Sequence, residues 1–267
     1  MANAPYMLPK DEKEINRLDF QHYMLRYALR GNFLAPVDRP ESILDVGCGT
    51  GRWMLEMAAD FPQANIVGFD LNVPALDGSV IAFPSNCTFR QGNLLAGLPF
   101  SASSFDFVHQ RLLAFALPVQ HWPVIIQELV RVTRPGGWIE LVEVDPLFKN
   151  QGPATRRMLD LIVQACGKRG IDLSIAHKLE ALVKATGVID VQSRVISIPV
   201  GDWGGRLGTM AKADFYAGNK TIAPLVATAT GATMEEYYRL ADAWMQECEQ
   251  YQTYCNFHVI YGLRQAQ

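Results

Sequence analysis

Leu44-Asp45-Val46-Gly47-Cys48-Gly49-Thr50-Gly51 is the most informative stretch of this sequence. It ends an apolar run at residues 43–46, which predicts a buried strand, and it precedes residues 52–61, which are predicted to form a helix. The glycines permit a tight turn and let a ligand approach the backbone where a Cβ atom would collide. Open α/β sheets bind ligands beyond the carboxyl ends of their strands, so we expect a ligand at this turn.

The spacing of the glycines and of two carboxylates indicates which ligand. The third glycine comes one residue earlier than in the GxGxxG fingerprint of dinucleotide-binding proteins. Asp45 lies two residues before the first glycine, where a carboxylate suits an ammonium group rather than a pyrophosphate. Asp70 ends the second predicted strand and can accept both hydroxyls of a ribose. A ribose at one end and an amino acid at the other describe S-adenosylmethionine (SAM).

Short apolar runs alternate with helical patterns along most of the chain. Such alternation predicts βαβ units and a parallel sheet covered on both faces. The predicted strands are residues 43–46, 65–69, 87–91, 105–109, 138–144, 191–199 and 255–263. The predicted helices after the N-terminal one are residues 52–61, 124–132, 155–168, 175–186 and 234–248, and residues 201–208 are predicted to be a glycine-rich link.

The first helix is predicted between Asp11 and Gly31, because Asp11 and Glu14 have capping-box spacing and Gly31 suits a helix end. Tyr23 and Tyr27 make it apolar on more than one face. The second face can pack within the chain or on a neighbouring copy, so a homo-oligomer through this helix is one of two expectations.

Composition excludes several classes of protein. The chain has 267 residues, 49% hydrophobic and 19% charged, which predicts a globular protein with a large core. The net charge of −3 shows no basic excess, so no nucleic-acid partner is expected. Five cysteines lack CxxC spacing and have no histidine at ligand spacing, so we expect no metal site and a reducing, cytoplasmic location. No secretory signal and no membrane-spanning apolar run are evident.

These features resemble the class I, seven-stranded SAM-dependent methyltransferases, most strongly over residues 40–145. ILDVGCGTG is a specific form of that family's first motif. The resemblance implies a doubly wound α/β fold whose mostly parallel sheet has an antiparallel last strand. It implies a single domain with a lid helix in residues 1–31, a SAM-binding core in 40–145, and an acceptor cap with the final two strands in 146–267. The implied cofactor-binding residues are Asp45, Gly47, Cys48, Gly49, Gly51, Asp70, Leu71, Asn93, Leu94 and Gln110.

The N-terminal segment resembles bacterial and fungal methyltransferases of secondary metabolism. In such proteins an N-terminal helix closes over the cofactor, which implies that Tyr6 and Gln21 lie near the methionine end of SAM. Residues 134–137 resemble the turn before the family's fifth strand.

Two side chains are candidate catalytic groups. Methyl transfer from a sulfonium is an in-line displacement, so the protein mainly supplies alignment, and a base is needed only if the nucleophile must lose a proton. His109 follows the fourth predicted strand and Glu143 lies in the fifth. The alternatives are a histidine bonded to a neighbouring carbonyl and a glutamate paired with an arginine.

The aromatic-rich C-terminal part favours a small, largely apolar natural product as acceptor, methylated on C, O or N, with S-adenosylhomocysteine as the other product. One alternative is a SAM-binding protein that catalyses a rearrangement or cyclisation, or that has lost methyl transfer and acts as a regulator. A protein or RNA methyltransferase is the second alternative. Residues 109–112 lack the Asn/Asp-Pro-Pro-Tyr/Phe motif typical of amino-nitrogen acceptors.

Overall fold

The computed structural model describes residues 12–73, 75–76, 79–80 and 83–266, so Tyr6 lies outside it. Its centre is a seven-stranded sheet in the order β5-β2-β1-β6-β7-β9-β8. The strands are β1 (Ser42–Val46), β2 (Asn65–Asp70), β5 (Cys87–Gln91), β6 (Phe105–Arg111), β7 (Thr133–Lys149), β8 (Ile189–Pro199) and β9 (Tyr254–Leu263). β9 pairs antiparallel with both β7 and β8, whereas the pairs from β5 to β7 are parallel. The predicted sheet is therefore confirmed, with its antiparallel last strand. A separate short hairpin joins β3 (Ala75–Leu76) and β4 (Ser79–Val80).

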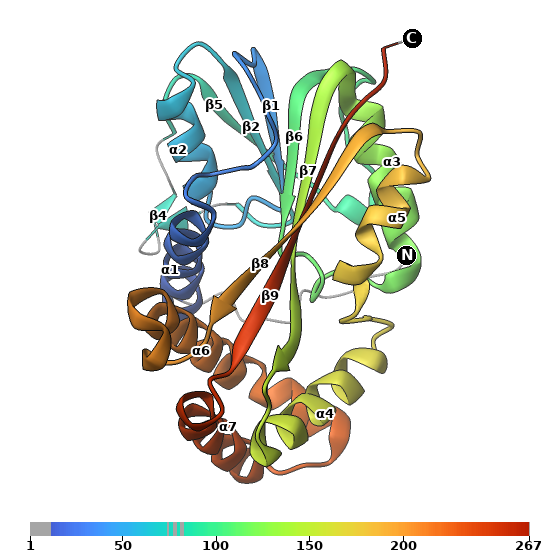
Figure 1. Cartoon of the computed structure of the whole chain (residues 1–267). Helices are drawn as coiled ribbons and strands as arrows, with labels where there is room; N and C mark the ends of the chain where they lie inside the picture. Colours follow the sequence, from blue (N-terminus) through green and yellow to red (C-terminus); the bar gives the residue numbers. More distant parts are fainter. Residues whose placement is uncertain (1–11, 74, 77–78, 81–82, 267) are drawn as a thin grey trace.

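Helices cover both faces of this sheet (Figure 1). On one side lie α1 (Glu12–Leu29) and α2 (Arg52–Asp60), and on the other lie α3 (Trp122–Val132) and α5 (Leu179–Lys184). Trp53 and Met54 of α2 pack on Ile43 and Phe107, and all four side chains are almost fully buried. Burial on both faces explains why the five residues of β1 are all buried and read as one apolar run.

The sheet order reverses direction at β1, which lies between β2 and β6. The chain winds outward from β1 in one direction and then returns to add β6 on the other side, so the loops after β1 and β6 diverge. Such a switch point leaves a crevice at the carboxyl ends of the strands. The glycine stretch directly follows β1 and lies at this crevice.

A second apolar core lies beyond one end of the long strands β7, β8 and β9 (Figure 1). It is formed by α4 (Pro153–Gly167), α6 (Gly205–Thr230) and α7 (Met234–Gln250), which contact one another. Tyr237 and Trp244 of α7 are fully buried there, so these two aromatics are core residues. Among the described residues, no helix is long and apolar enough to cross a membrane.

Three local predictions need correction. Residues 201–208 are not simply a link, because Asp202–Gly204 is a 3-10 turn and α6 begins at Gly205. Residues 134–137 lie inside β7 as an irregularity, where the β6 pairing moves from Phe105↔Thr133 to Phe107↔Trp138. The predicted helix at 175–186 is divided into the 3-10 helix η3 (Ile175–His177) and the short α5.

Candidate active site

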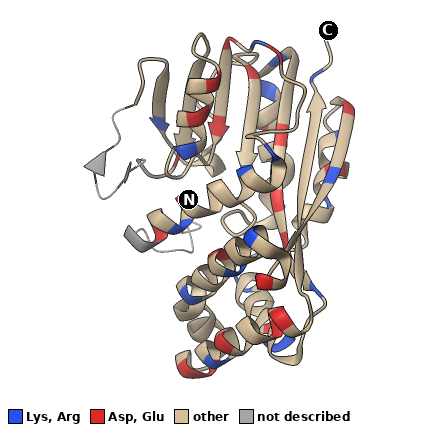
Figure 2. Ribbon diagram, turned by 60° about the vertical axis from the view of Figure 1, so that its left-hand side comes forward, with Lys and Arg blue, Asp and Glu red and all other residues tan. Residues whose placement is uncertain are grey.

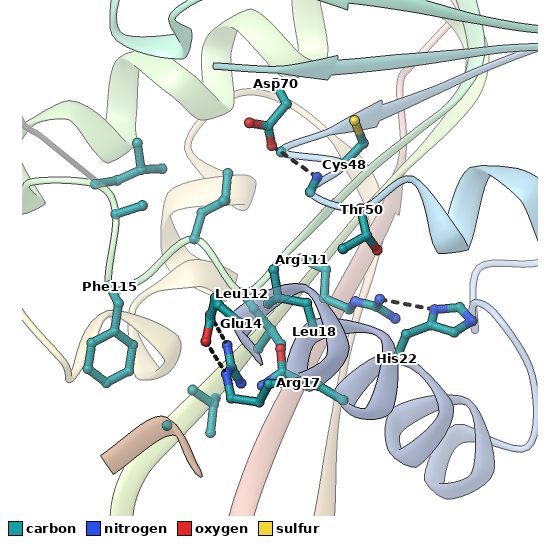
Figure 3. A pocket seen from close by; sticks show the side chains of 18 of the residues that line it. Glu14, Arg17, Leu18, His22, Cys48, Thr50, Asp70, Arg111, Leu112 and Phe115 are labelled. Atoms are coloured by element: carbon teal, nitrogen blue, oxygen red, sulfur yellow. Dashed lines mark hydrogen bonds and ion pairs between the residues drawn. The ribbon is translucent and has the colours of Figure 1, made fainter. Parts of the chain in front are cut away.

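A cavity of about 420 Å³ lies at the carboxyl ends of β1, β2, β5 and β6. The loops after these strands line one part of it, and residues of α1, α4 and α6 line the other. Figure 3 shows Asp70 and Cys48 near the glycine loop, with Glu14, Arg17 and Leu18 of α1 elsewhere on the wall. The cavity thus joins the predicted cofactor loop to the helical cap.

The glycine loop has the backbone conformation that its sequence requires. Gly47, Gly49 and Gly51 have φ angles of 73°, 55° and 76°, in the left-handed region that favours glycine. A Cβ atom on Gly47 would lie 2.7 Å from Leu113 Cδ2, whereas one on Gly49 would meet nothing within 4 Å. The open space at Gly49 fits a loop that approaches a bound ligand.

Asp70 holds the loop in place from the end of β2. One carboxylate oxygen accepts the Gly49 N–H at 3.0 Å, and the other accepts the Asn72 N–H at 2.9 Å. Burial raises the pKa of Asp70, and the backbone hydrogen bonds of Asn72 and Gly49 oppose that shift. A carboxylate has about four lone-pair sites, so Asp70 keeps capacity to accept further hydrogen bonds.

Asp45 and His109 form a buried pair on adjacent strands. Nδ1 of His109 lies 2.9 Å from Asp45 Oδ1, and their exposed fractions are 1% and 3%. The imidazole stacks on Trp53, with ring centroids 4.0 Å apart and an interplanar angle of 4°. Burial lowers the pKa of His109 despite the opposing contact with Asp45, so the ring is neutral near pH 7. Because Asp45 holds Nδ1–H, the lone pair is on Nε2, which has no hydrogen-bond partner in the described part of the chain.

Glu143 lines the cavity from β7 and is fully buried. Its carboxylate oxygens accept the N–H groups of Leu113 at 2.7 Å and Ala114 at 3.1 Å. Burial raises its pKa to about 8, although these two backbone hydrogen bonds lower it. The arginine pairing considered from the sequence is therefore wrong, since Glu143 fixes the loop after β6 instead.

Polar and charged side chains connect α1 to the cap and to β6. Gln21 Nε2 donates to Asp214 Oδ2 at 2.9 Å, and Arg17 binds Asp214 Oδ1 at 2.9 Å. Arg17 also binds Glu14 at 2.6 Å, as Figure 3 shows. Arg111 of β6 lies 3.2 Å from His22 Nδ1, and burial lowers the pKa of His22 to about 3, so His22 is neutral. The contacts with Asp214 therefore connect α1 directly to α6.

Most of the predicted site residues converge on the cavity. Those that line it are Gln21, Asp45, Gly47, Cys48, Gly49, Asp70, Leu71, Asn93, Leu94, His109 and Glu143. Asn93 also has a structural task, because its side chain accepts the Leu95 N–H at the start of a short 3-10 helix, η1 (Leu94–Ala96). Gly51 caps α2 outside the lining, and Gln110 is fully buried without lining the cavity.

Sequence reasoning missed the lining residues on the cap and on the loop after β6. These are chiefly Leu112, Phe115, Phe148, Leu159, Asp214, Phe215, Asn219 and Ile222. Six of these eight residues are apolar and resemble core positions, whereas Asp214 and Asn219 are polar. An aspartate inside a predicted helix could have indicated Asp214, but α6 itself was not predicted.

Comparison with known proteins places this geometry in a family. A family profile described as a methyltransferase domain matches residues 43–137. Methyltransferase str2 of Strobilurus tenacellus is 31% identical over 205 residues, covering 74% of this chain and 72% of that protein. Methyltransferase pytC of Aspergillus terreus is 32% identical over 246 residues, covering 86% and 74%. The secondary metabolism regulator LAE1 of Cochliobolus heterostrophus is 31% identical over 211 residues, covering 74% and 67%.

Two solved structures share the fold at low sequence identity. A methyltransferase assigned to an antibiotic biosynthesis pathway of Anabaena variabilis is 16% identical, with a TM-score of 0.61 over 94% of this chain and 99% of that one. A phosphoethanolamine N-methyltransferase of Haemonchus contortus, in complex with S-adenosylhomocysteine, is 14% identical, with a TM-score of 0.55. That alignment covers 97% of this chain and 61% of that enzyme. Together with the sheet order and the glycine loop, these similarities show that the chain belongs to the class I SAM-dependent methyltransferases.

Proposed function

We propose that this enzyme transfers the methyl group of SAM to a small, largely apolar natural-product acceptor of secondary metabolism. The observation that carries the proposal is the apolar cap end of the cavity. Phe148, Phe215 and Ile222 line it there, together with Leu112, Phe115 and Leu159. Apolar and aromatic walls with few polar groups suit an apolar acceptor better than a sugar or a nucleotide.

Three observations support binding of the cofactor at the other end of the same cavity. The left-handed glycine loop leaves open space at Gly49, Asp45 supplies a carboxylate, and Asp70 has remaining acceptor capacity. We propose that Asp45 faces the ammonium group of SAM and that Asp70 faces the ribose. When bound, the sulfonium supplies an already activated methyl group. The chain's own task is then to align the acceptor and exclude water.

His109 is the better of the two candidate bases for an acceptor that must lose a proton. Its neutral ring keeps Nε2 unpartnered within the described residues, while Nδ1 is held by Asp45. Both oxygens of Glu143 already accept backbone N–H groups, which suits a positioning role for the loop at Leu113 and Ala114. We therefore assign the proton-accepting role to His109 and the loop-holding role to Glu143.

Charge distribution supports a small acceptor over a nucleic acid. The chain carries 24 basic and 27 acidic residues. Figure 2 shows both signs interspersed along the helices and strands rather than gathered into one basic stripe. Nucleic-acid-binding surfaces are dominated by clustered Lys and Arg. The homo-oligomer through α1 stays a prediction, and the exposed Tyr23 and Tyr27 are the side chains that a second copy would cover.

The test is methyl transfer with labelled SAM. Purified enzyme is incubated with a panel of apolar phenols, alkenes and amines, and S-adenosylhomocysteine and methylated product are quantified by mass spectrometry. We expect stoichiometric formation of both with at least one acceptor. Asp70→Ala is the matched control and is expected to lose SAM binding. Tight SAM binding without product from any small acceptor would contradict the proposal, and methylation of a protein or RNA fraction instead would favour the alternative of a protein or RNA methyltransferase.

A further inference from the structure

Three side chains far apart in the sequence meet at one point beside the sheet. Asp145 of β7, His177 of η3 and His258 of β9 each present one ligand atom, and these atoms lie within 4.8 Å of one another. Asp145 Oδ2 lies 3.1 Å from His177 Nε2, and the two imidazole rings lie 4.7 Å apart at 73°. Two histidines and one carboxylate are a recurrent ligand set for divalent transition metals.

A second observation points to a ligand at this place. Nε2 of His258 is buried and has no hydrogen-bond partner among the residues that the structure describes, and the residue is only 8% exposed. An unpartnered polar atom in a buried setting costs free energy. A metal ion held between His258 and Asp145 would give that nitrogen a partner.

The surroundings of Asp145 also have the features of a metal site. The carboxylate is fully buried, and its other oxygen accepts the Leu147 N–H at 3.0 Å, which fixes its orientation. Hydrogen bonds of this kind commonly orient metal-binding side chains. His177 is 46% exposed, so an ion can enter from solvent and keep water in a remaining position. The thiol of Cys255 donates to the backbone oxygen of Asp145 and is not directed at the carboxylate.

We propose that Asp145, His177 and His258 bind one divalent transition-metal cation of the Zn²⁺ type. Zinc bonds of about 2.1 Å at tetrahedral angles place ligand atoms about 3.4 Å apart. The 3.1 Å separation of Asp145 Oδ2 and His177 Nε2 is close to this value, and rotation of the exposed His177 ring supplies the remaining adjustment. Spacing patterns could not reveal the site, because its ligands come from three separate elements.

The site lies next to the acceptor end of the cavity. Val144 and Pro146 line the cavity, whereas Asp145 between them does not. A bound ion would join β7 and β9 to η3, the turn that precedes α5. We assign it a structural role, since none of its three ligands lines the cavity.

Lys149 would compete with the ion for the carboxylate of Asp145. Its ammonium lies 3.1 Å from the same Asp145 Oδ2, but its side chain is 39% exposed. A metal ion would displace this ammonium into solvent. Removing the lysine charge while keeping an apolar stem, as in Lys149→Met, should therefore strengthen metal binding severalfold. An aspartate whose purpose is only to pair with Lys149 and His177 would show no such gain.

The experiment measures Zn²⁺ binding by calorimetry and Co²⁺ binding by visible absorption, on untagged, chelator-treated protein. We expect one equivalent in the wild type, at least tenfold weaker binding in His177→Ala, and stronger binding in Lys149→Met. Because the His177 side chain is partly exposed, we expect the His177→Ala variant to fold, and circular dichroism checks its secondary structure. His121→Ala, a histidine outside the cluster, is the matched control and should leave affinity unchanged.

Three outcomes would overturn the proposal. These are no binding by the wild type at metal concentrations up to about 100 μM, equal affinity in wild type and His177→Ala, and no gain in Lys149→Met. None of them depends on an acceptor being found, so they are independent of the proposed methyl-transfer reaction.

Discussion

The Thr50 hydroxyl of the glycine loop donates a hydrogen bond of 2.6 Å to the Asp19 carboxylate of α1. The other oxygen of Asp19 binds the guanidinium of Arg52, at the start of α2, at 2.6 Å. One side chain of α1 therefore holds both the glycine loop and the helix that follows it. We expect the position of α1 and the conformation of the loop to depend on each other through this residue.

Replacing Asp19 with alanine should weaken SAM binding. The substitution leaves Thr50 and Arg52 without this carboxylate and costs about 1–3 kcal/mol of interaction free energy. This corresponds to roughly a five- to 150-fold rise in the Kd for SAM if the cost falls on the SAM-bound conformation. Isothermal titration calorimetry with SAM measures the change in Kd. Asp38→Ala is the control, because Asp38 is 86% exposed and pairs only loosely with its neighbour Arg39 at 3.7 Å. Equal SAM affinity in the Asp19 variant and the wild type would show that α1 does not act through the loop.

His109→Gln should lower kcat by a factor of about 10² or more if the acceptor must lose a proton, while SAM affinity stays within a few fold. Gln can keep a donor toward Asp45 but cannot accept a proton. Because burial lowers the pKa of His109, the neutral base persists below its ordinary pKa of 6.5. Wild-type kcat should consequently fall with decreasing pH only below 6.5. An unchanged kcat in the variant would remove His109 from the chemistry.

Glu143 should make the folded protein less stable as pH rises between about 4.5 and about 8. Its folded pKa of about 8 lies above the ordinary value of 4.5, so the folded state binds more protons in this window. The free energy of unfolding then falls with pH, by up to about 1.4 kcal/mol per pH unit. Urea unfolding of Glu143→Gln across this range should give a shallower slope. Glu140→Gln is the comparison. Burial raises the pKa of Glu140 to about 7, so its contribution to the pH dependence of the unfolding free energy ends at a lower pH than that of Glu143. Equal slopes in wild type and Glu143→Gln would contradict the assignment.

The strands and the cofactor loop could be predicted because their requirements are local. Left-handed turns at Gly47 and Gly49 demand glycine, and strands buried on both faces give continuous apolar runs. The start of α6 could not be predicted, because its glycines are typical of loops. Gly208 is instead needed where the backbone of Gly201 packs against the helix. Pro224 inside α6 disfavours a helix by local propensity as well.

Contacts between distant segments were the other part that sequence reasoning could not supply. Arg17 and Asp214 are 197 residues apart, and no spacing rule connects them. Glu143 has the sequence context of an ion pair, yet it binds two backbone N–H groups that only the folded loop after β6 brings near. Which residues line the cap end of the cavity is likewise determined by how α4 packs against α6.

Phe215→Ala should raise the KM for the acceptor without changing the Kd for SAM. Phe215 lines the cavity from α6 and packs edge-on against Phe148, with ring centroids 5.0 Å apart. Loss of apolar contact in a substrate pocket is worth about 1–3 kcal/mol, or roughly 10- to 200-fold. Steady-state kinetics and calorimetry separate the two constants. Val163→Ala on α4 is the control, since Val163 is 44% exposed and lies outside the lining. A parallel change in SAM affinity would place Phe215 at the cofactor instead.

Gly47→Ala and Gly49→Ala should separate the folding and binding roles of the glycine loop. Both residues have positive φ, so each alanine carries a backbone cost of about 1–2 kcal/mol. At Gly47 the new methyl also meets Leu113, whose backbone is held by Glu143, so Gly47→Ala should lose more stability in the absence of SAM.

At Gly49 the methyl has open space in the protein, so its main effect should fall on the ligand. We expect Gly49→Ala to unfold at a urea concentration only slightly below that of the wild type, yet to bind SAM at least tenfold more weakly. Thermal melts with and without SAM test both variants together: the ligand-induced rise in Tm should be lost in Gly49→Ala, while the Tm without ligand falls further in Gly47→Ala. A full SAM-induced rise in Gly49→Ala would mean that the cofactor does not approach the backbone at this turn.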